Sequence, residues 1–460
     1  MIAAEPLPRG AKDPFMETRT AEAVLSLAID LKAAAAEVFL RSSSSTSVEV
    51  KDQTVDAFER ARDIGVGLRV LLGGRMGFAY TTDLSAAALK DLARSAVTNA
   101  GNTAADPFNT IPAKPSAPYR AVTIHDPAVA AVPDREKIER VMAMEREAFA
   151  VDPRVRRIRK ASATFSVSKT LMMNTHGAAL AYNGTAVSAS IEVVADERGE
   201  SQAGWEFDVK RSYRALDIEA VGRRAARKAI DLLGARHLDS VKAPVVLEAS
   251  VAEELLSILA SGLSAENVQK KKSLFIGRLG TDVVSPLITV HDDGLLEGGI
   301  GSAPADDELV PTQNKKVIDQ GRLALFLHNA YTAGRDRSES TGNGVRGGFR
   351  GTPGVGVTNL YIAPGPHAPE ELIASTSRGL MVTEIMGAHT ANPITGDFSV
   401  GATGFWIESG KKAFPVREIT ISGNILDLMK DVDAVGNDLR FSGRIGSPSL
   451  RVKELSIGGK

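Results

Sequence analysis

Two short acidic clusters are the groups in this sequence whose residue types could bind a hard cation. They are His291-Asp-Asp293 and Asp306-Asp-Glu308. Carboxylate oxygens are the ligands that Ca²⁺ and Mg²⁺ prefer in proteins. However, neither cluster has the spacing of a calcium-binding loop, and both flank glycine-rich turns. We therefore expect solvated carboxylates on turns at both places, and we expect no metal site in this chain.

Histidine, cysteine and serine offer no local catalytic arrangement. The chain has no cysteine, and no two of its 7 histidines lie within about five residues of each other, so no local pair of zinc ligands exists. None of the serines considered as nucleophiles, Ser264, Ser273 and Ser340, stands in a G-x-S-x-G elbow. The local sequence therefore predicts neither a nucleophile nor a transition-metal site.

Gly342-Asn-Gly-Val-Arg-Gly347 matches the G-x-G-x-x-G pattern of dinucleotide-binding loops. That pattern is informative only between a strand and a helix of a βαβ unit, whereas here another glycine- and proline-rich stretch follows it. We therefore expect no cofactor-binding site. The functional alternative for Gly342, Asn343, Gly344 and Gly347 is a mobile loop at the rim of a cavity or in a subunit contact.

The N-terminal half alternates between helical and strand patterns. Helices are predicted over 21–36, 85–100, 134–151 and 216–234, and strands over 37–41, 65–72, 76–81 and repeatedly between 155 and 210. Turns are expected at 175–177, 183–184 and 198–200. The serine tract Ser42–Thr46 is also predicted to be a polar turn, because Val48-Glu-Val-Lys51 resumes an alternating pattern directly after it.

Beyond Pro244 the chain becomes rich in glycine and in strand patterns. Two strands, 398–407 and 414–421, are joined by a tight turn at Ser409-Gly410, and a short helix is predicted over 424–432. A chain of 460 residues exceeds the usual size of one domain. We predict the α+β class, with an N-terminal α/β layered domain over 1–240 and a C-terminal Gly-rich, antiparallel sheet or barrel-like domain over 241–460.

Composition excludes several functional classes. Lys+Arg 55 against Asp+Glu 56 gives a net charge of -1, so no global basic field exists for direct nucleic-acid binding. The hydrophobic content of 43% is typical of a globular protein. The N-terminal residues have no signal-peptide pattern, and no run of about 18 apolar residues predicts a membrane contact. The absence of cysteine fits a reducing compartment, so we expect a cytoplasmic location.

Several segments stand in an order that distinguishes one protein family. They are 64–71 and 73–80, 173–177, 263–273, 340–343, 357–360, 364–365 and the long block 392–439. Together these segments resemble the TldD/PmbA family, and specifically its PmbA (TldE) branch. None is a sharp motif alone, and their common order over most of the chain carries the resemblance. The resemblance also implies a closed or nearly closed sheet in the C-terminal half.

The catalytic branch of that family, TldD, is characterised by His-Glu-x-x-x-His on a helix and a cysteine near the C-terminus. Such residues hold a divalent metal, and the glutamate takes a proton from the attacking water. Aligning Gly262-Leu263 with the family's Gly-Leu puts Leu256 and Ser261 at the histidine positions and Ser257 at the glutamate position. No cysteine follows Asn437-Asp438. The resemblance therefore implies no catalytic residue, metal or cofactor in this chain.

The periodicity of the same segment predicts a structural helix. Apolar residues recur on one face, at Val251, Leu255, Ile258, Leu259 and Leu263. Ser250 is expected to cap the helix N-terminus.

Three functional hypotheses follow. The resemblance implies a non-catalytic TldE/PmbA-type subunit of a TldD/TldE metalloprotease complex, which helps to enclose unfolded peptides for proteolysis. Its partner would be a TldD-like catalytic subunit that carries zinc or another divalent metal, with a homodimer expected in its absence. The alternative is a stand-alone adaptor, similar to a modulator of DNA gyrase, without a protease role. A third hypothesis is an independent hydrolase with an unrecognised site.

Overall fold

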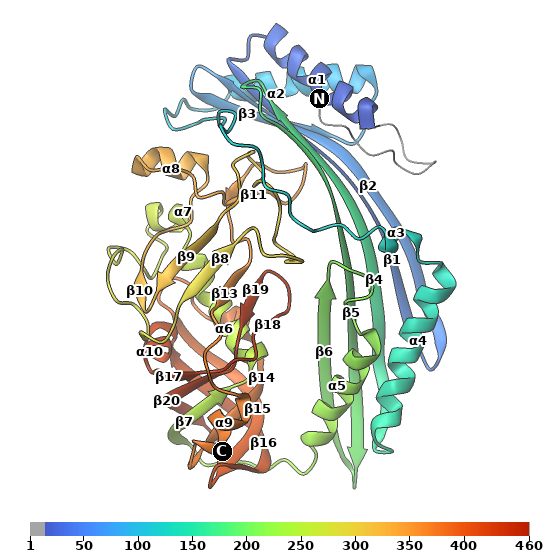
Figure 1. Cartoon of the computed structure of the whole chain (residues 1–460), viewed down its shortest axis with the longest axis vertical. Coiled ribbons are helices and arrows are strands. Elements are labelled where there is room, and N and C mark those ends of the chain that lie inside the picture. The colour runs from blue at the N-terminus through green and yellow to red at the C-terminus, as the bar shows by residue number, and fades with distance from the viewer. Residues whose placement is uncertain (1–13, 460) are drawn as a thin grey trace.

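A long, curled, six-stranded antiparallel sheet forms most of the N-terminal half (Figure 1). The computed structural model describes residues 14–459, so the N-terminal residues examined for a signal peptide lie outside it. The strand order is β3-β2-β1-β4-β5-β6. The strands are β1 Ala35–Lys51, β2 Thr54–Leu72, β3 Arg75–Thr81, β4 Val155–Asn174, β5 Ala179–Glu197 and β6 Glu200–Lys210.

Helices cover the outer face of this sheet, because alternate residues on that face are apolar. Val38 and Leu40 of β1 pack with α1 and α2 in one core cluster, whereas Val48 and Val50 pack with α4 and α5 in another. The helices are α1 Pro14–Asp30, α2 Ala86–Gly101, the short α3 Ala128–Ala131, α4 Asp134–Val151 and α5 Ile218–Asp231. Ser85 caps α2 with its side chain.

The inner face of the sheet carries hydroxyl groups instead of a core. The tract Ser42–Thr46, predicted to be a turn, lies inside β1 and is paired on both sides, by β2 and by β4. On the inner face, Ser43 and Ser45 stand opposite Ser168 and Ser166 of β4. The turn prediction was wrong because the pairing strands satisfy the backbone groups of the tract, while the hydroxyls of Ser43 and Ser45 face a polar space that needs no apolar residue.

The C-terminal half is built around a small barrel. Its sheet has the order β16-β15-β14-β7-β20-β17, and an additional β16–β20 pairing closes the first five strands into a ring. These strands are β7 Val241–Leu247, β14 Arg378–Met386, β15 Asp397–Glu408, β16 Lys411–Asn424, β17 Val432–Val435 and β20 Leu450–Gly458. Helix α6, Ala249–Gly262, shares the main core with these strands.

The C-terminal half has another six-stranded sheet, with the order β10-β9-β8-β13-β19-β18. It lies between the barrel and the N-terminal sheet (Figure 1). Its strands are β8 Val290–Asp293, β9 Asn314–Asp319, β10 Arg322–Leu323, β13 Leu360–Ile362, β18 Arg440–Phe441 and β19 Ile445–Ser447. The remaining elements are β11 Gly344–Val345, β12 Gly354–Val355, α7 Ala265–Gln269, α8 Ala330–Asp336, α9 Pro369–Ala374, η1 Ala388–Thr390 and α10 Ile425–Lys430.

The mixed α+β class is confirmed, with a curled antiparallel sheet followed by a barrel and sheets. The C-terminal half is not purely antiparallel, because β14 pairs parallel with β7 and β13 pairs parallel with β19. The predicted helix over 21–36 ends at Asp30, and Asn183-Gly184 lies inside β5 rather than on a turn. The two-domain division at residue 240 remains a prediction. No helix within residues 14–459 is long and apolar enough to cross a membrane.

Candidate functional site

Helix α6 holds the three positions at which the resemblance places catalytic metal chemistry. The Leu256 side chain is 1% exposed and belongs to the main core of the C-terminal half. Ser257 is exposed, and its hydroxyl donates to the Glu254 carbonyl at 2.6 Å. The half-buried Ser261 hydroxyl donates to the Ile258 carbonyl at 3.3 Å. All three side chains therefore serve the helix or the core.

The helix begins earlier than expected. Its N-cap is Glu248, which makes no side-chain cap bond, so the prediction that Ser250 caps the helix was wrong. Glu253 is buried on the α6 surface that faces β18 and β19, and it accepts a hydrogen bond from the Ser442 backbone N–H at 3.0 Å. Burial raises the pKa of Glu253 to about 7. The structure thus brings α6 into contact with the segment in which the family cysteine would lie.

This arrangement does not fit a catalytic metal. A leucine has no donor atom, and the two serine hydroxyls are engaged by their own helix. A catalytic zinc needs about three protein ligands and an open position for water. Across residues 14–459, no group of three or more His, Cys, Asp or Glu side chains could hold an ion. We therefore derive no chemical step through a metal in this chain, and the absence of catalytic residues remains a prediction.

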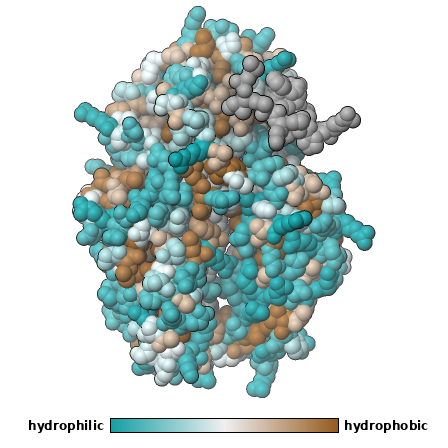
Figure 2. All heavy atoms as spheres, in the orientation of Figure 1, coloured by the Kyte–Doolittle hydropathy of each residue, from teal (hydrophilic) through white to brown (hydrophobic). Residues whose placement is uncertain are grey.

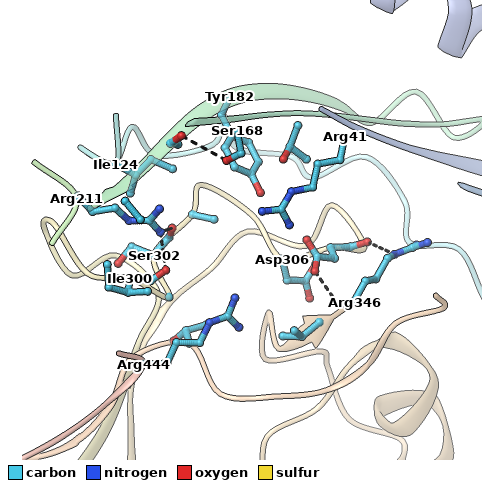
Figure 3. Close-up of a pocket in the computed structure, with 18 of the residues that line it drawn as sticks. Arg41, Ile124, Ser168, Tyr182, Arg211, Ile300, Ser302, Asp306, Arg346 and Arg444 are labelled. Atoms are coloured by element: carbon cyan, nitrogen blue, oxygen red, sulfur yellow. Dashed lines mark hydrogen bonds between the residues drawn. The ribbon is translucent and has the colours of Figure 1, made fainter. Parts of the chain in front are cut away.

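A cavity of about 470 Å³ lies between the inner face of the N-terminal sheet and the C-terminal half (Figure 3). The surface is hollowed where the two halves meet (Figure 2). Hydroxyl and arginine side chains dominate the lining from the sheet side, including Arg41, Ser43, Ser45, Ser166, Ser168, Thr170 and Tyr182. The C-terminal half contributes Ser302, Asp306, Asp307, Thr312, Thr358 and Arg444. The lining is therefore polar on both sides.

The glycine-rich loop reaches this cavity in part. Gly342 and Gly344 are among the lining residues, whereas Gly347 lies outside the lining. A Cβ atom at Gly344 would lie 2.8 Å from a Glu308 carboxylate oxygen, so a side chain is excluded there. Asn343 is fully buried, and its amide donates to the Asp292 carboxylate at 2.8 Å. The role of the loop as a rim or a subunit contact remains a prediction.

The acidic clusters are buried, so the prediction of solvated turn carboxylates was wrong. Asp306 accepts backbone N–H groups of Glu308 and Val310, each at 2.9 Å, and of Gly344 at 2.8 Å. Asp292, 0% exposed, forms an ion pair with Lys315 at 3.1 Å. Gly344 and Lys315 lie on other segments than the carboxylates that they bind, and the local sequence carries no signal for such pairing.

A buried ionic network joins the two halves. Arg69 of β2 binds Glu37 of β1 at 3.0 Å and Glu308 of the C-terminal half at 2.9 Å. Arg346 reaches back from the C-terminal half and also pairs with Glu37. Buried pairs of this kind tolerate the loss of neither partner, because the remaining charge stays out of water. The network therefore fixes the position of the C-terminal half against the sheet beside the cavity.

Three arginines converge on the cavity from separate segments, and the local sequence gave no sign of them. Arg41 lies on β1, Arg211 follows β6 and Arg444 precedes β19; Figure 3 shows their side chains around one space. The Arg211 guanidinium donates to the carbonyls of Thr185 and Gly299, both at 3.1 Å. Burial, followed by the charges of Arg444 and Arg41, lowers the pKa of Arg211 to about 10.

Comparisons with known proteins agree with this architecture. Three family models match the chain: PmbA/TldA metallopeptidase domain 1 over residues 36–100, the central domain over 127–233 and the C-terminal domain over 240–459. The metalloprotease PmbA of Escherichia coli O157:H7 is 30% identical over 443 residues, which cover 95% of this chain and 96% of that protein.

Solved structures show the same relationship. A crystal structure of a Thermotoga maritima protein has a TM-score of 0.89 and 30% identity, and the match covers 96% of this chain and 100% of that one. TldE from Thermococcus kodakarensis shares the fold, with a TM-score of 0.87 at 22% identity over 96% of this chain and 100% of that one. The chain therefore belongs to the PmbA/TldD metallopeptidase family, in which the PmbA branch is favoured over the TldD branch.

Proposed function

We propose that this chain is the non-catalytic, TldE/PmbA-type subunit of a heteromeric TldD/TldE metalloprotease, acting in the cytoplasm. A TldD-like partner supplies the catalytic zinc or another divalent metal. This chain contributes one wall of an enclosure that holds unfolded peptide while the partner cleaves it.

One observation carries the proposal. The helix that bears the metal motif in the catalytic branch is retained here as α6, but Leu256 at a ligand position is buried in the core. Without a metal-bound or base-activated water, peptide hydrolysis lacks a nucleophile. A chain with the fold of the family and without these metal ligands suits a role in assembly and substrate handling, which supports the proposal.

Exposed apolar side chains support a partner contact on the C-terminal half. Ile276, Leu279, Leu287, Met386 and Ile394 are each at least 45% exposed. Ile394 lines a depression with Leu274 and Arg278, so two separate segments contribute to one surface. A large exposed apolar side chain beside such a depression favours a protein contact. We expect this surface to bind the TldD-like subunit, and a second copy of this chain in its absence.

The test is co-expression with a TldD-like protein that carries His-Glu-x-x-x-His, followed by co-purification and light scattering. Each chain is then assayed alone and together on unstructured peptides. We expect cleavage by the mixture, inhibition by a chelator and no turnover by this chain alone. Chelator-sensitive turnover by this chain alone, or failure of the two chains to associate at micromolar concentration, contradicts the proposal.

The alternative is a stand-alone adaptor that modulates DNA gyrase. Its support is the name of the Thermotoga maritima relative, which refers to such modulation. The net charge of -1 gives it no further support from direct DNA binding. A gyrase supercoiling assay with the purified chain, in the absence of any TldD-like protein, distinguishes this alternative.

A further inference from the structure

Three of the four arginines that line the cavity lack carboxylate partners, whereas the fourth, Arg346, is paired with Glu37. In the part of the chain that the structure describes, 29 ion pairs connect cationic and acidic side chains, and none includes Arg41, Arg211 or Arg444. Asp63, on the strand next to Arg41, is occupied by Arg350 at 2.7 and 2.8 Å. Three guanidinium groups around one space repel each other, so an anion entering that space would relieve an existing cost.

The acidic residues of the same cavity are already engaged. Asp306 accepts three backbone N–H groups, and Asp307 accepts the Arg346 backbone N–H at 2.7 Å. The Arg346 guanidinium is turned to Glu37 of the sheet. These two carboxylates therefore bond to backbone donors of the C-terminal half. Burial raises the pKa of Asp307 to about 6, and the charges of Arg444 and Arg41 partly oppose that rise. The guanidinium groups of Arg41 and Arg444 form no hydrogen bond or ion pair with Asp307 or with another residue among 14–459.

Arg211 is held as a fixed positive charge by neutral groups alone. Its guanidinium donates to the backbone carbonyls of Thr185, Gly299 and Ile300. Carbonyl acceptors orient the side chain without cancelling its charge. Arg211 is thus a positioning residue for the cavity, whereas Arg41 is half-buried and Arg444 is exposed, so both can move to meet a ligand.

Hydroxyl groups surround these charges. Ser43, Ser45, Ser166 and Ser168 lie in register across β1 and β4 on the inner face. Guanidinium and hydroxyl donors together suit a carboxylate, which accepts several hydrogen bonds at once. The lining has a single aromatic residue, Tyr182, so it offers no row of stacking platforms for nucleic-acid bases. The lining therefore favours an acidic peptide over a single-stranded nucleic acid.

We propose that this cavity binds carboxylate groups of an unfolded peptide through Arg41 and Arg444, with Arg211 fixing the local positive charge, so that the subunit selects acidic peptide segments. This inference rests on the proposed function, because it assumes that the subunit handles peptide. It adds a substrate class: segments rich in Asp or Glu, or peptides that present a free C-terminal carboxylate.

The experiment measures binding of fluorescent, unstructured peptides to the full chain and to its complex with a TldD-like subunit. One peptide carries four glutamates and a C-terminal amide, a second carries glutamines and a free C-terminus, and a third carries glutamines and an amide. We expect the first or second peptide to bind at least about tenfold more tightly than the third, with a preference that weakens in salt. The first two peptides distinguish side-chain from terminal carboxylates.

Arg41→Gln with Arg444→Gln should abolish the preference, while each single variant reduces it. The matched control is Arg94→Ala, because Arg94 is an exposed arginine on α2 paired with Asp91; it should leave the preference unchanged. Arg211 is left unchanged because its guanidinium donates hydrogen bonds to backbone carbonyl groups. Circular dichroism and thermal unfolding of the double variant must match the parent, and otherwise the single variants decide the result.

The inference is overturned if all three peptides bind equally, or if the preference survives in the double variant. It is also overturned if neither the chain nor the complex binds peptide, or if inorganic phosphate binds and no peptide does. Tighter, Arg41-dependent binding of a ten-base single-stranded oligonucleotide also overturns it in favour of nucleic acid. Cleavage of all three peptides at equal rates by the complex leaves the proposed function standing while this inference fails.

Discussion

Replacing Leu256 by aspartate tests whether the position that the resemblance aligns with a metal ligand of TldD belongs to the core. Leu256 is 1% exposed among the apolar residues that join α6 to the barrel. Removing the buried leucine side chain costs about 2–3 kcal/mol. Burying an unpaired carboxylate adds about 2 kcal/mol more. The sum, about 4–5 kcal/mol, is a large part of the stability of a typical domain.

Ser257→Asp is the matched control, since it places the same side chain one residue along the same helix at an exposed position. Aspartate lowers helix propensity more when it replaces leucine than when it replaces serine, but by no more than about 0.7 kcal/mol, so a larger difference between the variants reports burial. We expect Ser257→Asp to change stability by less than about 0.5 kcal/mol. Urea unfolding can be followed by fluorescence of Trp406, which is 3% exposed in the same core.

The expected result is an earlier unfolding midpoint for Leu256→Asp, with partial recovery at acidic pH because the buried aspartate can take up a proton. If Leu256→Asp and Ser257→Asp unfold within about 1 kcal/mol of each other, then α6 does not bury this face, and the argument against a metal site on α6 loses its basis.

Other predictions concern charge, metal and assembly. Glu253 has a folded-state pKa of about 7, above its ordinary value, so stability should fall as pH rises from about 4.5 to 7. In urea unfolding, Glu253→Gln should therefore gain about 3 kcal/mol of stability at pH 8 and nothing at pH 4, and an equal gain at both pH values contradicts this reasoning. Glu308→Gln should cost about 3 kcal/mol by the same measurement, because Arg69 loses a buried partner. Elemental analysis should find no stoichiometric zinc in the purified chain, and about one tightly held metal per chain refutes that expectation. Light scattering should show a dimer, whose interface we expect to bury well over about 2,000 Å² as obligate interfaces do. A strict monomer, with or without a TldD-like protein, contradicts this prediction.

Local patterns predicted the elements whose partners lie close in sequence. Helix α4 has the predicted bounds, 134–151. The prediction succeeded because one continuous segment contains both the charged face and the apolar stripe of the helix. The β15–β16 hairpin follows the predicted turn at Ser409-Gly410, where both residues adopt positive φ. The helix after it was predicted too long, since α10 stops at Lys430 and β17 follows.

The site was less predictable because its partners are distant. The resemblance located Leu256, Ser257 and Ser261 by alignment with a known helix. In contrast, the buried Glu308 carboxylate pairs with Arg69, which stands 239 positions earlier in the sequence. No local sequence pattern indicates such a contact. The three cavity arginines present the same difficulty, since they come from β1, the segment after β6 and the loop before β19. Only a three-dimensional arrangement shows that their charges share one space.

The ring of β7, β14, β15, β16 and β20 also constrains the order of folding. Residues of β7, such as Val245, pair with both β14 and β20. The first strand of the barrel therefore stays unpaired until both of these strands, which are synthesised much later, have left the ribosome. Pairings of such long sequence separation are slow to form, and an unpaired strand edge invites association with other chains. The last strand of the N-terminal sheet ends at Lys210, so this sheet can form during synthesis, whereas the barrel cannot close before Leu450–Gly458 has been synthesised. The unfinished C-terminal half therefore exposes strand edges for an interval in which a chaperone would protect it from association.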